Sequence, residues 1–79
     1  MTNSTTSTHN YEMTITLVAG ENTYVEIYTQ KYNATSNKRT RKFFKNGKVQ
    51  TKHERFQVEE FMNDNISECL TVSKEWKTK

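Results

Sequence analysis

The basic side chains of this sequence gather in one segment. Nine of the twelve Lys and Arg residues lie between Lys31 and Arg55, together with a single acid, Glu54, which gives this segment a formal charge of +8. The flanking residues 1–30 and 56–79 carry −3 and −2, so the net charge of +3 hides an uneven distribution. Concentrated positive charge attracts phosphates. The segment therefore indicates a polyanionic partner.

Aromatic residues stand among these cations. If Phe44 faces the core of a sheet, then Phe43 faces away from it, on the same side as Arg39 and Arg41. An open sheet face with rings among Arg and Lys can stack unpaired bases while its cations hold phosphates. The nucleic-acid-binding residues predicted in this way are Tyr28, Arg39, Arg41, Lys42, Phe43, Lys45 and Lys48.

Two other interpretations of the same pattern stay open. Aromatic residues and arginine are also enriched in protein–protein interfaces, so this face is equally suited to a protein partner or to a second copy of the chain. A shift of the strand register by one residue would exchange Phe43 and Phe44 between the two faces of the sheet.

No set of residues favours catalysis or a bound metal. His9, His53 and Cys69 lack the spacing of metal ligands, and the two glycines, Gly20 and Gly47, stand singly in predicted turns, so no phosphate-binding loop is present. Cys69 is more typical of a small buried thiol than of a nucleophile. We expect neither an enzyme nor a cofactor.

Hydrophobic periodicity predicts the elements that carry these residues. Residues 11–18 and 23–31 alternate as two strands of a hairpin, with Ile15 and Leu17 facing the core beside Val25 and Ile27. A third strand over residues 39–45 leads into a turn at 46–47, where Asn-Gly is a strong hairpin signal.

A capping box at residues 51–54 predicts the start of a helix that ends somewhere between residues 64 and 69. Val58, Phe61, Met62 and Ile66 recur at helical spacing and form its expected buried stripe, with Cys69 as a further candidate. Residues 69–77 are expected to form a last strand with Trp76 in the core, although continuation of the helix is the alternative.

These elements predict an α+β fold, a small antiparallel sheet of three to four strands with one helix packed on one face, in the order β-β-β-α-β. Residues 1–10 are expected to be a disordered N-terminal tail, and residues 11–77 a single domain. A core this small is often completed by a partner, so a homodimer is a further expectation. A single cysteine and the lack of a signal peptide or membrane span indicate the cytoplasm.

The run from Phe43 to Thr51, followed by a capped helix, resembles a hairpin-to-helix element of small phage and low-GC bacterial proteins. In size and composition the chain is similar to the small α+β proteins that phages use against host defence. The leading hypothesis is a non-enzymatic protein that binds RNA or single strands. The alternative is a phage-type inhibitor or regulator that binds a host protein.

Overall fold

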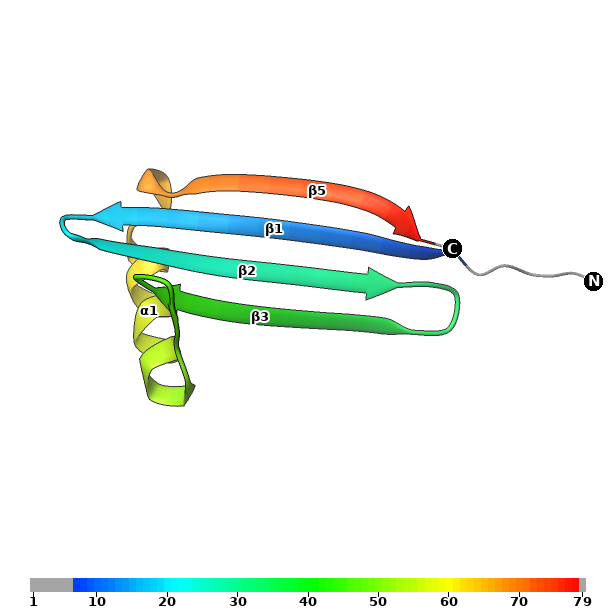
Figure 1. Ribbon diagram of the computed structural model, residues 1–79, viewed down its shortest axis with the longest axis horizontal. Helices are drawn as coiled ribbons and strands as arrows, with labels where there is room; N and C mark the ends of the chain where they lie inside the picture. Colours follow the sequence, from blue (N-terminus) through cyan, green and yellow to red (C-terminus); the bar gives the residue numbers. More distant parts are fainter. Residues whose placement is uncertain (1–6, 79) are drawn as a thin grey trace, which may run out of the picture.

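The strands of the computed structural model, which describes residues 7–78, form one antiparallel sheet in the order β4-β3-β2-β1-β5. Helix α1 (Lys52–Asp64) crosses one end of this sheet, and the strands extend well beyond it (Figure 1). A single 3₁₀ turn, η1, leads from the helix to β5. The bounds of the remaining elements are β1 (Thr8–Ala19), β2 (Asn22–Tyr32), β3 (Asn37–Lys45), β4 (Lys48–Val49), η1 (Ile66–Glu68) and β5 (Leu70–Thr78).

This architecture confirms the predicted α+β class and the position of the helix after three strands and a short fourth one. Residues 70–78 form a strand, so the alternative of a continuing helix is wrong. The first strand begins at Thr8 rather than Tyr11, and the predicted tail therefore loses residues 8–10 to β1. Residue 7 precedes β1, and residues 1–6 of that tail lie outside the described residues.

The predicted turn and helix start are present. Asn46 and Gly47 both have positive φ, 53° and 81°, and the turn pairs Phe44 with Val49. The side chain of Asn46 also joins this turn to the first hairpin, because its Oδ1 accepts from the backbone N–H of Thr23 at 2.9 Å. Helix α1 follows Thr51, whose backbone N–H donates to Oε1 of Glu54 at 3.5 Å.

The predicted faces of β2 and β3 are wrong. Leu17 pairs with Tyr24 and Ile15 with Glu26, so the even-numbered residues of β2 lie on the helix side. Glu26 in turn pairs with Phe43, which places Phe43 under the helix and Phe44 on the opposite face. The cause is that cross-strand partners in an antiparallel pair share a face. Val25 and Ile27 were predicted to face the core because they are apolar, but the register places them on the face opposite the helix.

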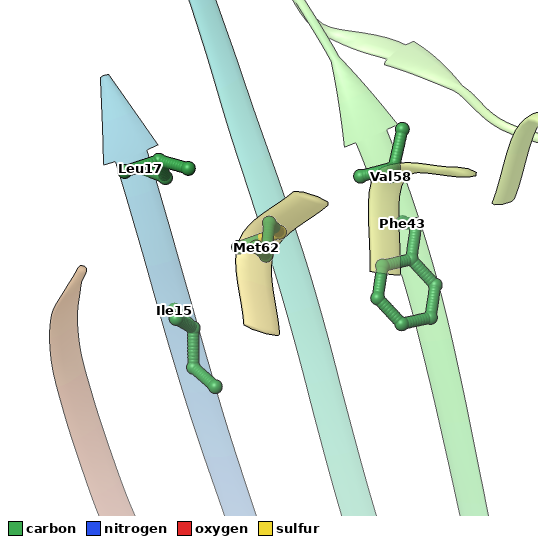
Figure 2. Packing of buried hydrophobic residues seen from close by; sticks show 5 residues of the cluster. All are labelled: Ile15, Leu17, Phe43, Val58 and Met62. Atoms are coloured by element: carbon green, nitrogen blue, oxygen red, sulfur yellow. The ribbon is translucent and has the colours of Figure 1, made fainter. Parts of the chain in front are cut away.

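Five side chains make the buried core between the sheet and α1: Ile15, Leu17, Phe43, Val58 and Met62. Phe43 is 0% exposed, and Val58 of the helix lies against it, while Met62 lies between β1 and β3 (Figure 2). Trp76 is not part of this core, contrary to expectation. It is exposed on β5, and its backbone partner on β1 is Asn10, on the face that the helix does not cover.

The burial of Phe43 can be tested by comparing it with a phenylalanine exposed on the helix. Phe43→Ala should lower the free energy of unfolding by about 3 kcal/mol, because it removes a fully buried ring and leaves a cavity. The milder Phe43→Leu should cost about 1 kcal/mol. Urea denaturation monitored by circular dichroism at fixed protein concentration measures both losses.

Phe56→Ala is the matched control, since the Phe56 ring is 66% exposed on α1. Its free energy of unfolding should stay within about 0.5 kcal/mol of the parent value. Equal losses for Phe43→Ala and Phe56→Ala would contradict the described packing.

Candidate nucleic-acid interface

The half of the helix-side face that α1 leaves uncovered carries four rings. His9, Tyr11, Tyr28 and Tyr32 all lie on this face, because His9 pairs with Tyr32 and Tyr28 pairs with Met13, a neighbour of the core. We call these four side chains the ring platform. The imidazole of His9 stacks on Tyr32 with ring centroids 5.0 Å apart, and Tyr11 meets Tyr28 edge-on at 6.0 Å.

The strands explain why the rings gather there. Alternate residues of a strand point to the same face about 7 Å apart, and directly paired residues on neighbouring strands are about 5 Å apart. The regular pairing of β1 with β2 therefore sets His9 and Tyr32 in one row and places Tyr11 and Tyr28 in the next rows towards the helix. The helix crosses the other end of the sheet (Figure 1), and among these rows it meets that of Tyr28, whose partner Arg41 contacts Glu59 of α1.

Cations flank the ring platform on both sides. Arg39 of β3 lies beside Gln30 in the row of Tyr11, and Lys77 of β5 pairs with His9. The acid on this part of the face is Glu75, which pairs with Tyr11. Within residues 7–78, no carboxylate lies within 4.0 Å of the guanidinium of Arg39, so its charge is available to a ligand.

Arg41, at the border between the ring platform and the helix, forms ion pairs with two carboxylates. Its Nε donates to Oε2 of Glu26 at 3.0 Å, and its Nη1 lies 3.2 Å from Oε2 of Glu59 on α1. The Glu26 side chain is only 9% exposed. The hydrogen bond to Glu26 raises the pKa of the Arg41 guanidinium above its ordinary value. Two carboxylates thus balance this charge, and Arg41 ties the helix to the sheet.

Two arginines, Arg41 and Arg55, lie over the ring of Phe43. The guanidinium carbons of Arg41 and Arg55 lie 5.4 Å and 5.6 Å from the centroid of its ring. A ring that is fully buried under cations and the helix has no face to offer a base. The prediction that Phe43 is exposed and stacks bases is therefore wrong.

A hollow opens where α1 meets the uncovered sheet. Three guanidinium groups line it, from Arg39, Arg41 and Arg55, together with Tyr28 and Met13. Glu26 forms its acidic part and is engaged by Arg41. Arg39 and Arg55 form no ion pair with any carboxylate in the described part of the chain. This hollow can accept a phosphate next to the ring of Tyr28.

The seven residues predicted for the site therefore do not form one surface in the structure. Tyr28 and Arg39 lie together on the open surface, and Arg41 borders it as a structural clamp. Lys45 and Lys48 lie at the other end of the sheet, beside Tyr24 and the start of the helix, where the ammonium of Lys45 is 5.8 Å from the Tyr24 ring centroid. Lys42 pairs with Ile27 and occupies the opposite face.

The predicted set lacks five contributors to this surface: His9, Tyr11, Tyr32, Arg55 and Lys77. His9 fell in the predicted tail, and Arg55 and Lys77 were assigned no role. The signal for His9 was present, since the alternation of Tyr11, Met13 and Ile15 continues back to it. Arg55 can be found only from the tertiary placement of α1 over β3.

Within residues 7–78, no three His, Cys, Asp or Glu side chains lie close enough together to hold a metal ion. Burial raises the pKa of the Cys69 thiol, whose Sγ lies 3.5 Å from the backbone oxygen of Asn65. A raised pKa lowers the thiolate fraction at neutral pH. The described helix is too short and polar to cross a membrane.

The clamp formed by Arg41 can be tested by removing it. Arg41→Ala should lower the free energy of unfolding by about 2 kcal/mol, because it leaves the nearly buried Glu26 carboxylate unpaired; Arg41 itself is partly exposed, which keeps the loss moderate. Adding Glu26→Gln should restore part of the loss. Urea denaturation measures each variant.

Arg39→Ala is the control for that experiment, since Arg39 is a neighbouring arginine on the same face without an ion pair among the described residues. It should unfold within about 0.5 kcal/mol of the parent protein. A parent-like stability of Arg41→Ala would show that the clamp does not hold the helix to the sheet.

Comparisons with protein-family models, with curated proteins and with solved structures found no match to this chain.

Proposed function

We propose that this protein is a non-enzymatic nucleic-acid-binding protein that takes RNA or other single strands on the ring platform. The observation that carries the proposal is the gathering of four rings on one open sheet surface, beside cations that form no ion pair within residues 7–78. Bases stack on aromatic rings whatever their identity, and each base so stacked contributes about 1–3 kcal/mol. Only unpaired bases can reach such rings, which favours single strands over duplex.

Each group on the surface has a role in this proposal. Tyr32, the most exposed ring of the platform, and Tyr28 stack bases, and Tyr11 and His9 support them from the neighbouring strand. Arg39 and Lys77 hold phosphates on either side, and Arg55 extends the cationic track into the hollow beside Tyr28. The single cysteine agrees with a cytoplasmic location, where RNA and single strands occur.

The cations of β3 support the proposal in a second way. Beyond its short contact with β4, β3 lies at the edge of the sheet, and its exposed cations project to both faces. Lys38 and Lys42 point to one face and Arg39 to the other. A backbone that leaves the ring platform can therefore run along this edge, and the affinity should fall steeply as salt rises.

Fluorescence anisotropy with labelled single-stranded RNA, single-stranded DNA and duplex DNA over a salt series tests the proposal. Single strands should bind more tightly than duplex, and Tyr32→Ala should weaken binding about tenfold through the loss of one stacked base. Arg39→Ala should weaken binding and also reduce the slope of the logarithm of affinity against the logarithm of salt concentration by about one.

Lys48→Ala is the matched control, because it removes the same charge at the far end of the sheet. It should change the affinity less than Arg39→Ala does. Equal effects of these two variants, or duplex binding as tight as single-strand binding, would contradict a role for the ring platform. No binding to any of the three probes at low salt would overturn nucleic-acid recognition and favour the alternative, a protein partner with an acidic surface.

A further inference from the structure

The face of the sheet opposite α1 has no covering layer in the described chain, and large apolar side chains gather in two of its rows. Phe44, Val25 and Ile27 lie half-buried in its centre. Leu70 and Val72 of β5 are 67% and 61% exposed, and Val49 of β4 is 52% exposed. We call these six side chains the apolar face. Thr14 and Thr16 of β1 lie between the apolar residues of β2 and those of β5. Exposed large apolar side chains gathered on one face mark an interaction surface.

We propose that the apolar face is the interface of a homodimer in which two copies of the sheet pack face to face. A second copy fits because the sheet is antiparallel, and two antiparallel sheets can pack face to face about 10 Å apart as in a β-sandwich. The second sheet supplies the missing layer, and α1 then lies on the outside of each copy.

The size of the face is adequate for this partner. Four strands about 4.8 Å apart and three alternate-residue rows about 7 Å apart span roughly 400 Å² in projection, and β4 adds Val49 to one row. The accessible surface of protruding side chains exceeds their projected area, so the face approaches the ~600 Å² per partner at the lower end of standard interfaces. Edge-to-edge pairing fits less well, since the outer edge of β5 carries Lys74 and Lys77.

The charges on this face select one orientation. Lys38 and Lys42 of β3 lie on one side of it, and Glu12 of β1, which pairs with Lys74 at 3.4 Å, lies on the other. A two-fold axis across the strands would place β3 over β3 and oppose these lysines. An axis along β2 instead places β3 of one copy over β1 of the other. Lys42 then lies opposite Thr14 of the second copy, one row from Glu12.

Side-chain size is complementary in the same orientation. The central row runs Val49, Phe44, Val25, Thr16 and Leu70 across the five strands. Rotation about β2 sets Phe44 opposite Thr16 of the second copy, a large ring over a small side chain, and Val49 opposite Leu70. Val25 meets its own equivalent near the axis. Lys31 also lies on β2, two rows beyond Ile27, where the crossing of the sheets separates the two copies.

Sedimentation equilibrium from low micromolar to near-millimolar concentration tests the dimer. The parent protein should show about twice the 9.4 kDa mass of one chain. Phe44→Asp and, independently, Leu70→Asp should shift the mass to one chain, while circular dichroism retains the folded signal because neither side chain belongs to the buried core. Phe56→Asp makes the same chemical change on the exposed side of α1 and should leave the dimer intact.

Crosslinking tests the orientation. With Cys69→Ser as background, Val25→Cys should crosslink to its own equivalent with a short bis-maleimide, since it lies near the axis. Val49→Cys should not, because the two copies of Val49 lie at opposite edges of the interface. A single-chain mass for the parent protein at all concentrations, a dimer that survives both aspartate variants, or crosslinking of Val49→Cys but not of Val25→Cys would overturn the proposal.

Discussion

The register of the first hairpin is the constraint on which the rest of this structure depends. A two-residue turn at Gly20 and Glu21, with Gly20 at φ 64°, makes Ala19 pair with Asn22 and Leu17 with Tyr24. A shift by one residue would move every side chain of β2 to the other face. The register therefore decides that Glu26 lies under the helix and that Val25 and Ile27 do not.

Placing Glu26 under the helix requires compensation. A carboxylate with so little exposure needs a cation and hydrogen bonds, and the next strand provides Arg41 directly beside its pairing partner Phe43. Arg41 also reaches Glu59, so the ion pair fixes the position of α1 over the end of the sheet. Because α1 lies over this end, the half of the same face farther from the helix is uncovered, and the ring platform lies there.

The sheet thus has two unlike faces. On one, the helix buries a core of five side chains at one end and leaves rings and cations at the other. On the other, apolar side chains cover the region directly behind the core, with lysines at the β3 side. A binding surface and a contact between copies can therefore coexist, because they use opposite sides of one sheet.

Much of the fold could be predicted from the sequence, since local signals determine it. The alternation of β1, the Asn46-Gly47 turn and the start of α1 after Thr51 are short-range features, and each is present in the structure. The faces could not be predicted from hydropathy alone, because Val25, Ile27 and Phe44 are as apolar as the residues that are buried. Tracing the pairing from Leu17 through Tyr24 to Lys45 would have placed them correctly.

The site was predicted in part for the same reason. Arg39, Arg41 and Phe43 were correctly placed on one face with Tyr28, since they alternate along β3 and pair with β2. Which of them the helix covers depends on its tertiary position and on Arg41 meeting Glu59. Within β3 alone, the choice between Phe43 and Phe44 as the buried ring stays open, because both are phenylalanines on opposite faces of the strand.

Nuclear Overhauser contacts from the two adjacent phenylalanine rings test the assignment of the faces most directly. The ring of Phe43 should show contacts to the methyl groups of Val58 and Met62 of α1, and the ring of Phe44 should show contacts to Val25 and Val49 but none to the helix. Contacts from Phe44 to Val58 and Met62 would contradict the account, since they would require the register of the sheet to be shifted by one residue.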